Sequence, residues 1–428
     1  MDDLRVRFGR LDRLDVPDLW NEAVTRAAEH DTAWRPARSR LVLLIAVALL
    51  LAALAGAMAI GAWLNREPAP DQPAAQFDNG LIVGQRECQL IAIDPASNEA
   101  RELLPSLPEC AVGEHPAAHT AWSADGRYLA YVVARMCVAC FTDFPQEVLD
   151  KAGAWIYDAT TDAMRQLAPC PERYCEEVDI SPDGSLVAFT ARSGSGPERH
   201  ALIVSAVEPG GPSRRIELPG WPGRPRFSPD GTRIVTPVAE GPPGLYAVDV
   251  AAILEAEPSH DLELDLLHEA AGVANPAWSP DGDWIAFEAV ASDEVGIWLI
   301  RADGTDARAV AIDKAQPPSG PAWSPDGTQI AYVRAFSRSG STPGRLQLWT
   351  VGVAGGDPTL VYESECCLRD WKPPTWSPDG EYIAFSFAIE ASANSGLALI
   401  RPDGSDLRFI SDHLEPDWQP VPLESPAG

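Results

Sequence analysis

Four groups of residues in this sequence have the types or the spacing that chemistry requires. Cys137 and Cys140 form a Cys-x-x-Cys pair, the spacing of redox and zinc sites. His115 and His119 are four residues apart, as in a helical metal site. Residues 193–196 read Ser-Gly-Ser-Gly, which is part of a hydrolase nucleophile pattern, and an aspartate recurs in repeated Ser-Pro-Asp-Gly segments. These groups would supply redox, metal, acyl-transfer or acid–base chemistry.

Each group also has a structural explanation that we prefer. No second Cys-x-x-Cys pair and no βαβ pattern accompany Cys137 and Cys140. Pro116 lies between the two histidines and favours a loop over a helix. Residues 193–196 lack the first glycine of Gly-x-Ser-x-Gly and lie in a polar stretch. The repeated aspartate suits a turn. The sequence therefore predicts no catalytic residue, no cofactor and no metal ligand.

The aspartates belong to a five-residue motif, Trp323-Ser324-Pro325-Asp326-Gly327 in its fullest form. Ser, Pro, Asp and Gly in this order suit a type I turn, and the following run of β-branched and aromatic residues (329–333) predicts a strand of a hairpin. The motif occurs six times at intervals of 45 to 58 residues, with the apolar anchors Trp122, Ile180, Phe227, Trp278, Trp323 and Trp376. Such periods are typical of propeller blades.

The strands that follow each copy predict an all-β fold, a β-propeller of four-stranded blades. Residues 80–104 contain three strands of a further unit whose first strand is missing, and Trp418 lies 42 residues after Trp376. We therefore expect the C-terminal strand to complete the first blade, which closes a ring of seven blades without a free sheet edge. The propeller spans residues 79–420 and a short tail spans 421–428.

The run Trp-Ser-Pro-Asp-Gly-x-x-Ile-Ala-Phe/Tyr resembles the repeat of TolB-type, WD-repeat-like propellers of bacteria, over about four fifths of the chain. The resemblance implies the propeller fold. It does not imply an activity, because similar repeats also occur in propellers attached to serine peptidases. TolB-type proteins are soluble, carry an α/β domain before the propeller and bind an envelope lipoprotein. This chain departs from them, so that partner is not carried over.

Residues 41–64 are 24 consecutive residues without a charge, about 36 Å as a helix, which is enough to cross a bilayer core of about 30 Å. Arg35, Arg38 and Arg40 precede the span, so the positive-inside rule predicts a cytoplasmic N-terminus. A cleaved signal peptide is the alternative, but the apolar run is long and begins late for one. We expect a single-pass protein of the bacterial cytoplasmic membrane with an extracytoplasmic propeller.

Two segments flank the predicted span. Residues 1–40 carry eight arginines and eight acidic residues, and their apolar spacing predicts two short helices. This tail is either a solvated juxtamembrane segment or a docking peptide for a cytosolic protein, with Trp20 as its anchor. Residues 65–78 are rich in proline and alanine and predict an extended linker.

All eight cysteines follow the predicted span, on the oxidising side of the membrane, which favours disulfides. Local pairs are the simplest expectation: Cys88 with Cys110, Cys137 with Cys140, and Cys170 with Cys175. Cys366 and Cys367 are adjacent, so they either form a vicinal bridge or pair elsewhere.

The charge of the exported part limits the kinds of ligand that it can bind. The whole net charge of −29 arises after residue 40, so this part repels nucleic acid. Its acidity serves either solubility or a cationic partner. We expect a non-enzymatic envelope scaffold or receptor that binds a protein, peptide or glycan. The alternative is an extracellular propeller enzyme, a lyase or hydrolase acting on a carbohydrate or an ester.

Overall fold

The computed structural model describes residues 80–86, 89–95, 97–104, 117–133, 152–170, 174–192, 200–239, 241–255, 262, 264–291, 294–313, 317–336, 345–365, 373–388, 395–411 and 414–420. The predicted tail with Trp20, the predicted span at 41–64, the linker and the C-terminal tail lie outside these ranges. Within them, we find no helix with the length and apolar composition needed to cross a membrane.

The Ser-Pro-Asp-Gly turn is held by the hydrogen bonds that its residue types predict. In the fullest copy, the Gly327 N–H donates to the Ser324 carbonyl at 2.9 Å, and Gly327 has a left-handed φ of 68°. The Ser324 hydroxyl donates to Asp326 Oδ1 at 2.6 Å and accepts from the Gln329 N–H at 2.9 Å. The bond from the Ser324 hydroxyl, with those from Thr328, lowers the pKa of Asp326. The aspartates of the motif are therefore turn residues, as predicted.

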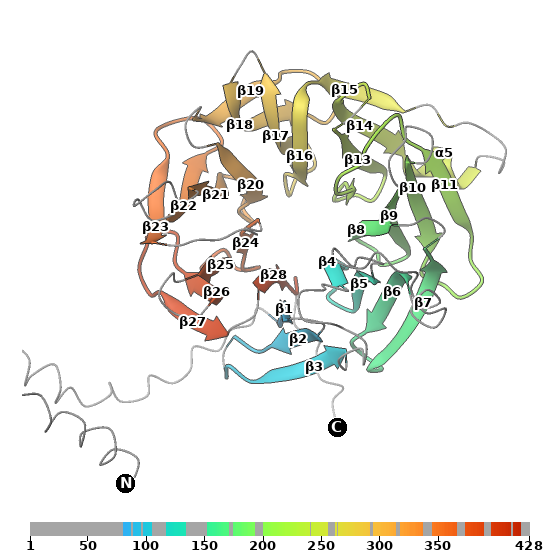
Figure 1. The fold of residues 1–428 in the computed structure, drawn as a ribbon, viewed down its shortest axis with the longest axis horizontal. Helices are drawn as coiled ribbons and strands as arrows, with labels where there is room; N and C mark the ends of the chain where they lie inside the picture. The colour runs from blue at the N-terminus through green and yellow to red at the C-terminus, as the bar shows by residue number, and fades with distance from the viewer. Residues whose placement is uncertain are drawn as a thin grey trace, which may run out of the picture. The chain divides into compact units, whose positions relative to one another are not determined.

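The described strands form seven antiparallel four-stranded sheets, the blades of a β-propeller (Figure 1). In every blade the strands succeed one another in chain order from the axis outward, except that the innermost strand of blade 1 is the last of the chain. Blade 1 contains β28 (Leu414–Trp418), β1 (Ile82–Arg86), β2 (Gln89–Ile93) and β3 (Ala100–Leu104). Blade 2 contains β4 (Ala117–Trp122), β5 (Tyr128–Val133), β6 (Gly153–Asp158) and β7 (Ala163–Pro169). Blade 3 contains β8 (Tyr174–Ile180), β9 (Leu186–Arg192), β10 (His200–Ala206) and β11 (Ser213–Glu217).

The remaining four blades repeat this order. Blade 4 contains β12 (Arg226–Phe227), β13 (Arg233–Val238), β14 (Gly244–Asp249) and β15 (Asp265–Glu269). Blade 5 contains β16 (Ala271–Trp278), β17 (Trp284–Ala291), β18 (Glu294–Arg301) and β19 (Arg308–Ile312). Blade 6 contains β20 (Pro318–Trp323), β21 (Gln329–Phe336), β22 (Arg345–Gly352) and β23 (Thr359–Glu365). Blade 7 contains β24 (Thr375–Trp376), β25 (Ile383–Ala388), β26 (Ser395–Ile400) and β27 (Arg408–Ser411).

The ring is closed by the C-terminal strand, as predicted. Strand β28 pairs antiparallel with β1, with Ile82 opposite Trp418 (Figure 1). The next residue, Gln419, is 2 % exposed. Its side-chain amide accepts from the Leu81 N–H at 2.9 Å and donates to the Gly126 carbonyl in blade 2 at 2.7 Å. One side chain thus joins the closing strand to both blade 1 and blade 2.

The hydrophobic core lies between neighbouring blades, because each sheet is apolar on both faces. Ile383 and Phe385 of blade 7 pack with Leu348 of blade 6 in one buried cluster. On the other face of blade 7, Tyr382 and Leu399 pack with residues of blade 1. The closing blade is therefore held by packing as well as by strand pairing.

Two features add to the predicted repeat. A short helix, α5 (Val250–Glu255), follows β14 and buries Val250 and Ile253; the strand pattern of the sequence did not predict it. Cys170 and Cys175 form a disulfide with a Cα–Cα distance of 5.9 Å, as predicted. This bridge joins the end of blade 2 to the first strand of blade 3. Cys88, Cys110, Cys137, Cys140, Cys366 and Cys367 lie outside the described residues.

Candidate functional site

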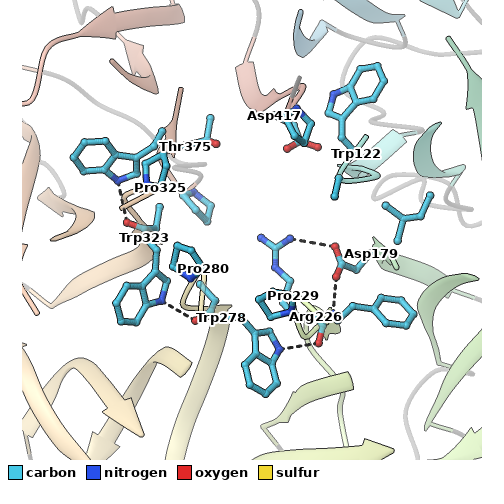
Figure 2. Close-up of a pocket in the computed structure, with 18 of the residues that line it drawn as sticks. Trp122, Asp179, Arg226, Pro229, Trp278, Pro280, Trp323, Pro325, Thr375 and Asp417 are labelled. Carbon is cyan, nitrogen blue, oxygen red and sulfur yellow. Dashed lines mark hydrogen bonds and ion pairs between the residues drawn. The ribbon is translucent and has the colours of Figure 1, made fainter. Parts of the chain in front are cut away.

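A cavity of about 530 Å³ lies at the centre of the ring, and it is the candidate site (Figure 2). Its lining comes from the innermost strands and from the prolines of the repeated turns. Side chains alternate along a strand, so the residue just before each anchor faces the axis. In blades 1 and 3 to 7 this residue lines the cavity, and the set is Asp417, Asp179, Arg226, Ala277, Ala322 and Thr375.

The turn prolines form a rigid collar on this cavity. Pro182, Pro229, Pro280 and Pro325 all line it. Each lies beside the glycine of the next turn along the chain; a Cβ added to Gly327, for example, would lie 3.7 Å from Pro280 Cδ. That is ordinary contact, so the left-handed backbone, not lack of space, requires glycine in these turns.

The tryptophan anchors bind neighbouring blades together beneath the collar. Trp278 Nε1 donates to the Arg226 carbonyl at 3.1 Å, and Trp323 Nε1 donates to the Ala277 carbonyl at 2.9 Å. Both tryptophans also line the cavity, and Figure 2 shows the dashed bonds from their indoles to the preceding blade. Phe227 has no indole. At that interface the Asp179 carboxylate instead accepts from the Phe227 N–H at 2.7 Å.

The cavity wall is asymmetric. Blades 5 to 7 present small side chains from Ala277, Ala322 and Thr375, whereas blades 1 to 4 present charged and polar ones. On the charged side, Arg226 Nη1 lies 3.3 Å from Asp179 Oδ1, and Figure 2 shows this pair projecting toward the centre. We call Thr120, Asp179, Arg224, Arg226 and Asp417 the charged wall.

The charged wall spans blades that are far apart in the sequence. Arg224 Nη2 donates to the Thr120 carbonyl at 2.7 Å, and the Thr120 hydroxyl donates to Asp417 Oδ2 at 3.1 Å. Thr120 therefore links Arg224 of blade 4 to Asp417 of blade 1.

Burial perturbs the pKa values of the groups at the two ends of this chain of bonds. Burial raises the pKa of Asp417 to about 6, although Arg224 and Arg226 act in the opposite direction. Burial also lowers the pKa of Arg224, and the neighbouring charge of Arg226 lowers it further. This cavity places a carboxyl group whose pKa is close to neutral pH beside two guanidinium groups. Such a site can bind a charged ligand or transfer a proton.

None of the residues of the charged wall was singled out in the sequence. The available signal was the position immediately before each anchor, where Asp179, Arg226 and Asp417 interrupt small residues. Among the sequence candidates, only Cys170 and Cys175 are brought together within the described ranges, and they lie away from the cavity lining. No group of three or more His, Cys, Asp or Glu side chains suited to a metal ion occurs among the described residues.

Comparisons with known proteins show what this chain is similar to. No protein-family model matches the sequence. It is 28 % identical over 214 residues to the uncharacterized protein Atu1656 of Agrobacterium fabrum, covering 48 % of this chain and 67 % of that one.

One solved structure illustrates the likeness of fold, and a second aligns with a lower score. The periplasmic gluconolactonase PpgL of Pseudomonas aeruginosa aligns with a TM-score of 0.54 at 14 % identity, over 80 % of this chain and 99 % of that one. TolB from Acinetobacter baumannii aligns with a TM-score of 0.47 at 15 % identity, over 81 % and 68 %. At these identities the likeness concerns the fold alone.

Proposed function

We propose that this chain is a membrane-anchored, extracytoplasmic binding module whose propeller captures a ligand in the central cavity. The span at 41–64 is its anchor in the bacterial cytoplasmic membrane, with the N-terminus in the cytoplasm. The propeller acts outside as an envelope scaffold or receptor that takes a protein, peptide or glycan ligand. The tail at 1–40 docks a cytosolic protein through Trp20, so ligand capture outside can be signalled inside.

The observation that carries this proposal is the preorganised cavity. Its collar consists of prolines in hydrogen-bonded turns, and its charged wall is fixed by bonds that cross between blades. A site whose side chains are already held in place loses little conformational entropy when a ligand binds. A volume of about 530 Å³ is also within the usual range of ligand pockets.

The charge of the chain supports a ligand other than nucleic acid. The acidic excess of the exported part repels polyanions such as DNA and RNA. The cavity, by contrast, has two arginines and two aspartates on one side and mainly apolar residues on the other. Such a wall suits an amphipathic ligand of modest size.

Site-specific photo-crosslinking in the bacterium tests this proposal. One variant of the full chain carries the crosslinker at Pro325 on the collar, and its control carries it at Leu360, which is 42 % exposed on the outer strand β23. A third variant carries the crosslinker at Trp20 and tests the proposed docking of a cytosolic protein by the tail. We expect the Pro325 crosslinker to capture a ligand that the Leu360 crosslinker does not. Equal capture at both positions would contradict a role for the cavity.

An extracellular propeller enzyme is the second candidate, and one observation favours it. Burial in the cavity raises the pKa of Asp417 to about 6, which suits a general acid or base near neutral pH. The test is a hydrolysis and elimination assay on carbohydrate and ester substrates with the wild type and with Asp417→Asn. If the wild type turns over a substrate and Asp417→Asn does not, the protein is a lyase or hydrolase and not a binding module.

A further inference from the structure

Arg224 lines the central cavity, and no carboxylate of the described residues forms a direct ion pair with its guanidinium. One of its terminal nitrogens donates to the Thr120 carbonyl. Its Nε atom is buried and has no hydrogen-bond partner. The guanidinium group carries five N–H donors in a planar fork, so most of its donor capacity is unused. Asp417, Glu177 and Asp179 act electrostatically on this cation without a direct ion pair among the described residues. A buried cation with unpaired donors is unfavourable, which makes this residue a receptor for an anion.

Arg226 extends the same receptor. It is two residues further along the chain, and both arginines line the cavity. One terminal nitrogen of Arg226 pairs with the Asp179 carboxylate. The Nε atom of Arg226 is buried and has no hydrogen-bond partner. The two guanidinium groups are close enough for the charge of one to lower the pKa of the other.

We propose that the cavity binds a small organic carboxylate, whose anionic group is held by Arg224 and Arg226 and whose carbon skeleton packs against Ala277 and Ala322. This inference rests on the proposed function as a binding module and names the class of its ligand. Arginine binds a carboxylate through two parallel hydrogen bonds, which fits the unused donors. The alanines and prolines of blades 5 to 7 supply the apolar contact.

The acidic residues of the charged wall favour a ligand with one negative charge over a ligand with two. Asp179 and Asp417 both line the cavity, and Glu177 also acts electrostatically on Arg224. Each would repel a phosphate dianion more strongly than a carboxylate. A cation, in turn, would have to approach two guanidinium groups to reach Asp417.

Binding of the carboxylate is coupled to a proton on Asp417. The groups that face Asp417 are Arg224, Arg226, Asp179 and the hydroxyl of Thr120. An anion placed on the two arginines removes their stabilising effect on the ionised carboxylate and adds a like charge. Asp417 therefore takes up a proton when the ligand binds, and the ligand binds more tightly at lower pH.

Propionate is the probe, with propionamide and propylammonium as its neutral and cationic analogues. Binding is measured by ligand-observed NMR on the full-length chain in lipid nanodiscs. We expect propionate to bind in preference to both analogues. Arg224→Gln weakens propionate binding about tenfold or more, because a charge-assisted hydrogen-bonded pair is lost. Arg345→Gln is the matched control, since Arg345 pairs with Glu363 outside the cavity, and it leaves binding unchanged.

The pH dependence separates this inference from simple charge attraction. Between pH 7.5 and 5.5 the wild type should bind propionate about tenfold more tightly, since Asp417 becomes neutral while propionate stays mainly ionised. Asp417→Asn should bind at pH 7.5 as tightly as the wild type does at pH 5.5, and its affinity should not vary with pH. An unchanged pH slope in Asp417→Asn would overturn the coupling.

The remaining outcomes are also decisive. Preference for propylammonium, or equal effects of Arg224→Gln and Arg345→Gln, would overturn the carboxylate site. If Arg224→Gln fails to fold by circular dichroism, Arg224→Lys replaces it; lysine keeps the charge but not the fork and should bind propionate several-fold more weakly. No propionate binding together with specific capture at Pro325 would refute the carboxylate class and leave the binding module intact. Failure of both experiments would reject the proposed function itself.

Discussion

The indole Nε1 of Trp323 donates a hydrogen bond of 2.9 Å to the backbone carbonyl of Ala277, one blade earlier in the chain. The same bond joins Trp376 to Ala322 and Trp278 to Arg226. Each indole therefore bridges to the residue that faces the cavity in the preceding blade. The bonds that hold the blades together are also those that fix the cavity wall.

Replacing Trp323 by phenylalanine tests the value of this bond. Trp323→Phe keeps an aromatic ring but leaves the Ala277 carbonyl without its donor, so we expect a loss of about 1 to 2 kcal/mol in the free energy of unfolding. Chemical denaturation followed by circular dichroism measures the change. Trp221→Phe is the control, because Trp221 is 38 % exposed, and it should change stability by less than about 0.5 kcal/mol. Equal effects of the two substitutions would show that the bond from Trp323 to the Ala277 carbonyl does not stabilise the fold.

Removal of the Gln419 amide should destabilise the closure of the ring. Gln419→Ala leaves the Leu81 N–H and the Gly126 carbonyl without partners at a buried position, so the expected loss is about 2 to 4 kcal/mol. Hydrogen exchange should show the increase in opening first in β1 and β28, where the closing pair lies. Uniform exchange across all blades would contradict a local role for this side chain.

The disulfide between Cys170 and Cys175 should contribute modestly, because it closes a short loop. Replacing both cysteines by serine should lower the free energy of unfolding by about 2 kcal/mol. Thermal unfolding with and without a reductant provides the measurement. The double variant should show a smaller shift on reduction than the wild type, while a wild type insensitive to reductant would argue against the bridge.

Asp417 should make stability depend on pH in an unusual direction. Its pKa in the folded chain, about 6, exceeds the ordinary value of 3.8, so between these values the folded state binds more protons than the unfolded state. Stability should therefore rise as the pH falls from about 7 toward 4. Asp417→Asn removes this contribution and should be more stable than the wild type at pH 7 by about 1 to 3 kcal/mol. Denaturation of both proteins across this range measures the difference, and parallel curves would contradict the assignment.

The amino-acid sequence determined the architecture of the propeller. Turn residues act on their own neighbours, as Ser324 and Asp326 do, and strands alternate with a period of two, so both signals are local. The repetition of these signals predicted the blades, and the unpaired strand near Trp418 indicated how the ring closes. The helix α5 was missed, because six residues carry too weak a periodic signal against the strands around them.

The candidate site was decided by the tertiary structure. Arg224 reaches Thr120 across 104 residues of chain, and Thr120 reaches Asp417 across 297. No local pattern links these positions, because they become neighbours only when the innermost strands of separate blades converge on one axis. A charged residue before an anchor could be read in the sequence, but its partners and its burial depended on closure of the ring.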